Sequence, residues 1–443
     1  MSLLRLILLV LLIPLTGCAT SSAIQQARYE FHAGAPEKAL DTLENADVSE
    51  RDALLLLLDK GAVAFSAGQF ERARIALLDA VDLMDEWDEI RVGEQAATLL
   101  TSEWAKRYRG EYSERLWVHS YLMMTFLMQN NPEGAAVEAR RALQRIDEHK
   151  DSLTMDWFTR ALIGLSFEAA GAHDSAQVVY RQLADHPQYD GRWNHVIQRH
   201  SKRLGRDPIV KALSTDEDYI GTPTQLGNDE GELIIFLQTG HIDQKLPHNI
   251  AIDLDLHIAF PFYGDYRISP PFYTVTTDDE VVAADEIDTH LVSVSSRALA
   301  ARGKTIAAKQ VARIATKRAV VNLAADEDTV FAGVLQVLLF VTEQADTRSW
   351  ETLPGWQGLL RVPLAEGQHN VEVTVKHRGR SHRVNLGDFT IEAKGLHFAT
   401  FRTDLPIPLS EPEPTPLNAL TGKGVTNPSE ARPFPSVNSA NPS

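Results

Sequence analysis

The feature that most constrains the fold is a pattern in the first half of the chain that returns after 34 residues. The two copies read Phe31-x-Ala33-Gly34-x-Pro36-x-x-Ala39 and Phe65-x-Ala67-Gly68-x-Phe70-x-x-Ala73. A glycine between two helices can adopt a left-handed conformation, and a small residue on one helix lets the next approach closely. One such helix pair cannot bury its own apolar face, so neighbouring copies must stack.

Further copies extend this repeat toward residue 205. Their marker residues are Gly164, Ala170, Gly171 and Ala176 in a third copy, and Asn130 and Ala135 in a weaker one. A period of 34 residues is typical of tetratricopeptide (TPR) repeats. We therefore predict a TPR-like α-solenoid over residues 18–205, with a generic helical bundle as the alternative.

The second half of the chain is rich in strand patterns. The continuous apolar run Leu233–Leu237 suits a strand covered on both faces, and apolar residues alternate with polar ones over Ile250–Phe260. Apolar and polar residues also alternate over Val371–Val375, before a turn and a return strand that runs to Ile391. In the return strand the apolar residues change from even to odd positions at Gly387, which indicates a bulge. These patterns, with one more strand from Leu396 to Thr400, predict a mostly antiparallel β-sandwich-like domain over residues 229–403.

These patterns give an α+β fold class with five parts. A helical segment of about residues 295–324 is inserted into the β-rich domain. The polar residues 206–228 are predicted to link the two domains. Residues 404–443 are rich in Pro, Ser and Asn, cannot bury enough apolar surface to fold, and are predicted to form a disordered tail.

The first residues of the chain predict export and lipidation. An apolar run from Leu6 to Leu15 leads into Thr16-Gly17-Cys18. This run is too short to cross a bilayer of about 30 Å permanently, but it suits a signal peptide. Cys18 is the only cysteine, so the mature chain can form neither an internal disulfide nor a thiolate metal site. We predict that residues 1–17 are removed as a lipoprotein signal peptide and that the Cys18 sulfur carries acyl chains such as palmitate.

Location and charge narrow the classes of partner. Ala19 and Thr20 follow Cys18 without an aspartate that would favour the inner membrane, so we expect an outer-membrane anchor that faces the periplasm. The net charge of −17 repels nucleic acid, which excludes a general nucleic-acid-binding role.

Charged residues form two candidate contact sites. A basic ridge on the predicted helical insertion comprises Arg302, Lys309, Arg313 and Lys317. It either binds an anionic partner, such as lipid headgroups, or neutralises nearby acids of the chain, namely Asp278, Asp279, Glu280, Asp285 and Glu286. Asp346 and Arg348, next to Trp350, would face the same side of an extended segment. Their ion pair either braces the domain edge or contacts a ligand.

Motifs that indicate catalysis are incomplete. The sequence Arg302-Gly303-Lys304-Thr305 lacks the upstream glycine and the preceding strand of a phosphate-binding loop. Asp253, Asp255 and His257 would share the polar face of one strand and hold a divalent cation, but a solvent-facing strand explains them equally well. His119 fits a packed helical histidine better than a base, because no carboxylate pattern accompanies it. We predict no enzymatic activity, no cofactor and no metal, with a hydrolase or metalloenzyme as the less favoured alternative.

Three segments carry a resemblance to a known family. They are Tyr108-Arg109-Gly110-Glu111, Glu138-Ala139-Arg140-Arg141 and Ala345-Asp346-Thr347-Arg348-Ser349-Trp350-x-x-Leu353-Pro354. With them the chain resembles a family of uncharacterised bacterial lipoproteins with TPR repeats, from Cys18 to about residue 403. The resemblance implies an anchor and an architecture, and it supplies no catalytic residues.

The expected function is that of a lipid-anchored interaction scaffold or assembly factor, with a protein or peptide partner in the solenoid groove. The alternative is a lipoprotein that binds peptidoglycan or another glycan, or regulates peptidoglycan synthases. Aromatic residues of the strand domain that we expect to be exposed would bind such a glycan; they are Phe262, Tyr263, Tyr266, Phe272 and Tyr273.

Overall fold

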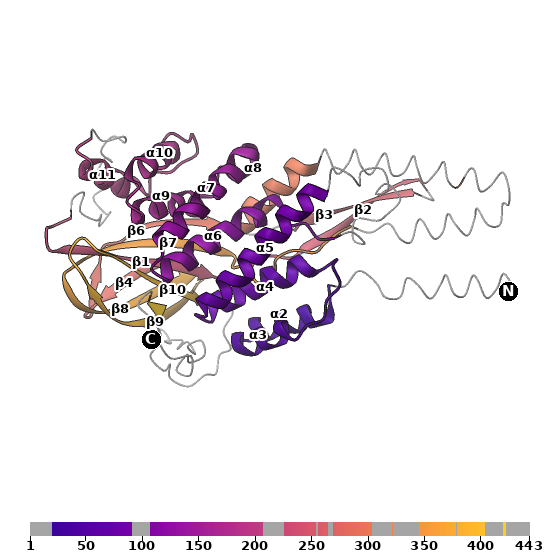
Figure 1. The fold of residues 1–443 in the computed structure, drawn as a ribbon, viewed down its shortest axis with the longest axis horizontal. Coiled ribbons are helices and arrows are strands. Elements are labelled where there is room, and N and C mark those ends of the chain that lie inside the picture. Colours follow the sequence, from indigo (N-terminus) through magenta and orange to yellow (C-terminus); the bar gives the residue numbers. More distant parts are fainter. Residues whose placement is uncertain are drawn as a thin grey trace.

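The helices of the first half of the chain precede all of the described strands, and one further helical stretch, residues 291–303, interrupts the strands (Figure 1). The computed structural model describes residues 20–90, 107–206, 226–253, 256–264, 269–303, 321, 345–377, 379–403 and 420–421. The helices are α2 Ser22–His32, α3 Pro36–Glu44, α4 Ala53–Ser66, α5 Phe70–Ile90, α6 Tyr112–Met128, α7 Pro132–Glu148, α8 Lys150–Leu153, α9 Trp157–Ala169, α10 His173–Ala184 and α11 Asn194–Arg203. The strands are β1 Glu230–Thr239, β2 Lys245–Asp253, β3 Leu256–Tyr263, β4 Phe272–Thr277, β5 Glu280–Val282, β6 Asp285–His290, β7 Trp356–Ala365, β8 Gly367–His377, β9 Arg380–Ile391, β10 Leu396–Thr403 and β11 Leu420–Thr421. The predicted α+β class is confirmed.

Four helix pairs share one kind of turn. The second residue after the first helix has a positive φ in each pair: 80° at Gly34, 72° at Gly68, 55° at Asn130 and 71° at Gly171. In each turn the next N–H bonds to the carbonyl five residues earlier, as Ala35 does to Glu30 at 3.0 Å. This bond satisfies a carbonyl that the helix end leaves free. The left-handed turns predicted from the repeat are therefore confirmed.

Close packing within the pairs explains the small residues of the repeat. A Cβ atom placed on Gly61 of α4 would lie 2.4 Å from the Leu77 side chain of α5. A Cβ on Gly164 of α9 would lie 2.3 Å from the Tyr180 ring of α10. The role predicted for glycine on the first helix is confirmed at both positions.

The strands form two larger sheets and a separate hairpin. The orders are β11-β10-β1-β7-β6, β5-β4-β8-β9 and β2-β3. Pairing is antiparallel except between β1 and β10, which are parallel. The bulge predicted at Gly387 is confirmed, because the β8–β9 register shifts there and Gly387 has a φ of 93°.

The helices cover one face of the five-stranded sheet, and the four-stranded sheet covers the other (Figure 1). Alternate residues of β1 divide between the two interfaces. Ile234 and Phe236 belong to a core shared with the helices, whereas Leu233, Ile235 and Leu237 belong to the core between the sheets. The double coverage predicted for Leu233–Leu237 is confirmed, and the helical and strand-rich parts share one apolar core.

The predicted strand over residues 250–260 is wrong. The structure has a hairpin there, with Asp253 paired to Leu256 across the turn, and the hairpin projects from the body of the molecule (Figure 1). A register shift between Ala251 and Asp253 lets Ile250 pair with Ile258. The shift adds one extra residue to β2, so that even-numbered residues of β2 lie opposite even-numbered residues of β3. The apolar alternation therefore continues from one strand into the next and hides the turn.

The remaining predicted boundaries fall partly outside the described residues. Residues 291–303 are helical, so the insertion begins four residues earlier than predicted, and of the rest of 295–324 only residue 321 is described. Most of the predicted linker and of the predicted tail also lie outside. Within that tail, Leu420 and Thr421 pair with β10.

Candidate functional site

Residues 345–355, here called the Trp350 segment, lie across the first helices of the repeat. The backbone N–H of Trp350 donates to Glu114 of α6 at 2.8 Å, and the Thr352 hydroxyl donates to Asp59 of α4 at 2.8 Å. Arg28 of α2 pairs with Glu351 at 2.8 Å. The segment therefore contacts three successive inner helices, a name used here for α2, α4, α6 and α9.

The predicted pair of Asp346 and Arg348 is present. Arg348 Nε donates to Asp346 Oδ1 at 2.8 Å, and its Nη1 donates to Asp52 Oδ1 at 3.1 Å. Burial lowers the pKa of Arg348, but the two carboxylates outweigh burial and raise it above its usual value. Of the two expected roles, bracing fits this geometry, but the contact it makes is with the helical half through Asp52.

Trp350 is a core residue. Its side chain is fully buried, its ring centroid lies 5.3 Å from that of Tyr121, and its indole N–H donates to Thr352 at 3.0 Å. A side chain without exposed surface is not available to a ligand in this conformation. The contact role considered for Trp350 therefore has no support in the geometry.

Of the predicted basic ridge, only Arg302 lies within the described residues. Arg302 pairs with Glu111, which also accepts a hydrogen bond from Lys245 at 2.9 Å. Burial opposes ionisation of Glu111, but the two cations outweigh it and hold its pKa at about 2. Arg302 thus neutralises an acid of the chain, but that acid is Glu111 and not one of the acids near residue 280 that the sequence predicted. Lys309, Arg313, Lys317 and the lipidation residue Cys18 lie outside the described residues.

A second buried ion network, not found from the sequence, joins the helices to the sheet. Arg361 of β7 donates to Glu168 of α9 at 2.8 and 2.9 Å, and its Nε donates to Glu232 of β1 at 2.7 Å. Arg199 of α11 links Glu232 to Asp285 of β6, both at 2.9 Å. Burial disfavours the charged carboxylates, but the attraction of Arg361 outweighs this effect. It holds the pKa of Glu168 well below its usual value and also lowers the pKa of Glu232.

His119 has a carboxylate partner that the sequence did not reveal. Its Nδ1 lies 2.7 Å from Glu138 Oε2 of α7, and both side chains are nearly fully buried. Glu138 also pairs with Arg141 at 3.4 Å. The prediction that no carboxylate accompanies His119 was therefore wrong, because its partner, Glu138, lies on the next helix. The pair lies in the helical core, which agrees with a packed histidine.

The structure contradicts two further predictions, the cation site on one strand and the exposure of the aromatic residues. Asp253 and His257 lie on the two arms of the β2–β3 hairpin, and Asp255 is outside the described residues, so the three do not share one strand. The described part of the chain has no cluster of acids, histidines or cysteines suited to a metal ion.

Tyr263 and Tyr273 are buried, since apolar residues of both sheets and the helices surround them. Phe262 is half-buried, Phe272 is exposed, and Tyr266 is outside the described residues.

The second helices of the four pairs, α3, α5, α7 and α10, form an outer layer that leaves one face uncovered. Ile75, Val137 and Val178 stand two residues after the repeat alanines Ala73, Ala135 and Ala176, and they are 49 %, 46 % and 56 % exposed. Single exposed apolar residues are common on proteins, but these three recur at one repeat position. We call Ile75, Val137 and Val178 the outer row.

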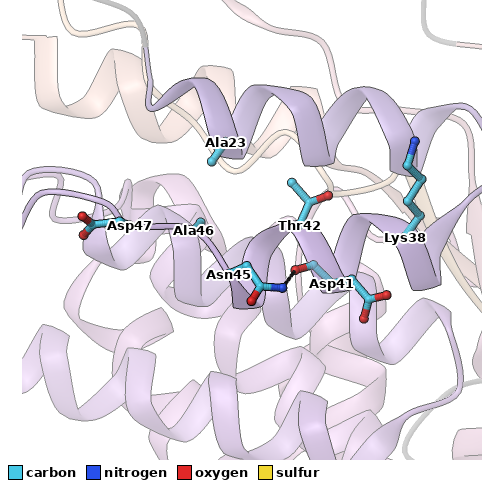
Figure 2. Close-up of a pocket in the computed structure, with 7 residues that line it drawn as sticks. All are labelled: Ala23, Lys38, Asp41, Thr42, Asn45, Ala46 and Asp47. Carbon is cyan, nitrogen blue, oxygen red and sulfur yellow. Dashed lines mark hydrogen bonds between the residues drawn. The ribbon is translucent and has the colours of Figure 1, made fainter.

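Hollows of the described surface include the following two. One, of about 470 Å³, lies beside α2 and α3 and is lined by Lys38, Thr42 and Asn45 among others (Figure 2). Its polar groups bond to the chain itself, since Thr42 donates to Glu30 at 2.7 Å and Asn45 donates to the Asp41 carbonyl at 2.8 Å. We assign no ligand to it. The other, of about 450 Å³, lies between α9 and β6.

Comparisons with known proteins do not place the chain in a family. No family model, curated protein or solved structure matches it. Among the described helices, none is both long enough and apolar enough to cross a membrane.

Proposed function

We propose that this protein is a lipid-anchored envelope lipoprotein of the outer membrane that acts as an interaction scaffold or assembly factor. In this proposal Cys18 carries the acyl chains and the rest of the chain faces the periplasm. The four helix pairs are TPR-like repeats, and the two packed sheets form a β-sandwich-like domain interrupted by a helical insertion. Two or more acyl chains provide an anchor that a single chain does not.

The geometry of the inner helices bears on where a partner binds. Their faces pack on β1, β7 and the Trp350 segment, so the groove predicted to hold a partner contains residues of the chain itself. A partner in that groove stays a prediction, and it would require displacement of buried Trp350. The outer helices need no such displacement.

The outer row is the observation that carries the proposal. Ile75, Val137 and Val178 offer β-branched side chains to solvent on three outer helices, and the repeat places them at one position. Exposed apolar residues flanked by charged ones are typical of protein interaction surfaces. Charged neighbours here include Glu71 and Arg74 on α5. We infer that a protein partner docks on this face.

Capture from detergent-solubilised envelopes tests the proposal. The purified mature chain should retain a defined set of envelope proteins, and the triple variant Ile75→Lys, Val137→Lys, Val178→Lys should lose it. The matched control replaces three exposed apolar residues of the strand half, Leu246→Lys, Phe272→Lys and Val281→Lys, and should retain the set. Equal capture by both triple variants, or no specific capture by the unaltered chain, contradicts the proposal.

A further inference from the structure

The hollow between α9 and β6 has aromatic walls. Trp157, at the start of α9, and Trp356, at the start of β7, both line it. The His290 ring lies 4.8 Å from the Trp356 ring, centroid to centroid, and Trp356 is only 6 % exposed. Trp157 is half-buried, and its ring contacts His186 at 5.0 Å. The half-buried Trp157 ring therefore offers a flat apolar face to a ligand, whereas nearly all of the Trp356 ring is covered by the protein and closes the wall behind it.

The polar groups of the hollow include an unsatisfied acceptor. Asp288 is 3 % exposed, and its Oδ1 accepts from Arg192 at 2.9 Å. The other carboxylate oxygen, Oδ2, accepts no hydrogen bond from any described residue. A buried acceptor without a donor is costly, and a hydroxyl or amide of a ligand would satisfy it after a small shift of the side chains that cover Oδ2.

The charges that line the hollow cancel. Among the described lining residues the charged ones are Asp190, Arg192, Asp288 and Arg297. Arg192 already pairs with Asp190 at 2.7 Å and with Asp288 at 2.9 Å. A phosphate or a cation would therefore find little net charge to bind. A neutral ligand with many hydroxyl groups fits better.

We propose that this hollow, lined by Trp157, Trp356, Asp288 and Arg192, binds one or two pyranose rings of a neutral glycan segment. The apolar face of a pyranose ring packs on an indole, while its hydroxyl groups bond to the carboxylate and the guanidinium. A volume of about 450 Å³ lies within the range of small-ligand sites. The site differs from the aromatic set expected from the sequence. It is also independent of the outer row, so the failure of either proposal leaves the other standing.

Calorimetry and tryptophan fluorescence on the mature chain in detergent test the site. One arm uses chitotriose, a neutral oligomer of the N-acetylglucosamine found in peptidoglycan strands, and the other uses a neutral hexose trisaccharide of the kind found in lipopolysaccharide core, which separates the two envelope sources. At least one probe should bind and change the tryptophan emission. Trp157→Ala should weaken that binding roughly tenfold or more, because it removes one stacking face.

Two further variants keep the test decisive. Pro270→Arg places a long side chain on an exposed rim position and should also weaken binding without touching the core. Phe272→Ala removes an exposed aromatic residue outside the hollow and should leave binding unchanged. The proposal is overturned if neither probe binds, if Trp157→Ala and Pro270→Arg bind as the unaltered chain does, or if only Phe272→Ala loses binding.

Discussion

Replacing Arg361 by methionine should destabilise the protein strongly, because it leaves Glu168 and Glu232 buried without their shared cation. Each of these carboxylates is about 3 % exposed, and Arg361 contacts both. Removal of one partner from a buried ion pair costs about 3–5 kcal/mol, mainly through the charge left behind. We expect a loss of this size in the free energy of unfolding, measured by urea denaturation at pH 7 with circular dichroism.

The chain offers a matched control on strand β9 of the four-stranded sheet. Arg383 pairs with Glu372 at 2.8 Å, but its side chain is 69 % exposed. Arg383→Met should therefore cost less than about 1 kcal/mol. Adding Glu168→Gln and Glu232→Gln to Arg361→Met should recover part of the loss, because the two carboxylates that lost Arg361 then carry no charge. Equal effects of Arg361→Met and Arg383→Met would refute the reasoning.

Two further perturbations have outcomes that follow from packing and from titration. Gly164→Ala should cost about 1–3 kcal/mol in urea denaturation, since the new Cβ meets the Tyr180 ring at 2.3 Å, whereas Gly303→Ala, with open space around it, should change stability by less than about 1 kcal/mol. Equal effects of the two would contradict the packing argument. Burial, and then Asp288, raise the pKa of Glu286 to about 8, so the folded chain keeps a proton that the unfolded chain loses near 4.5. The stability that this group contributes is therefore present below pH 4.5 and is lost as the pH rises to 8. Glu286→Gln should reduce this decline in the free energy of unfolding by up to about 1.4 kcal/mol per pH unit. If the variant and the unaltered chain show the same pH profile of stability from pH 5 to 8, the assignment is wrong.

Local patterns in the sequence predicted the local structure well. The turn residues Gly34, Gly68, Asn130 and Gly171 and the bulge at Gly387 depend on backbone conformations that only a few residue types adopt readily. Such preferences act over a few residues, so the sequence reveals them directly. The alternation over 250–260 misled for the same reason, because neither glycine nor proline lies between Asp253 and Leu256, the paired ends of the two strands.

Long-range pairing was not accessible from the sequence. Arg361 and Glu168 lie 193 residues apart, and Trp350 and Glu114 lie 236 apart. Arg361, Glu168 and Glu114, taken alone, fit a solvent-exposed position equally well. Only the docking of the inner helices on the sheet makes them buried partners. The parallel pairing of β1 with β10 is hidden in the same way, because these strands are distant in the chain.

In the candidate site, too, local contacts could be predicted from the sequence and long-range contacts could not. The sequence singled out Asp346 and Arg348, and the structure pairs them, since two residues on one side of an extended segment meet without help from the rest of the fold. The outer row could have been found by comparing the repeat copies two positions after each alanine. The hollow between α9 and β6 could not, because its lining residues come from five separate segments.

Lipidation of Cys18 is the central claim, and metabolic labelling tests it most directly. Cells that produce the unaltered chain or Cys18→Ser are grown with radioactive palmitate, and the protein is then recovered from membrane and soluble fractions. We expect label and membrane association for the unaltered chain, and loss of both for Cys18→Ser. An unaltered chain without label, or identical fractionation of the two forms, would contradict it.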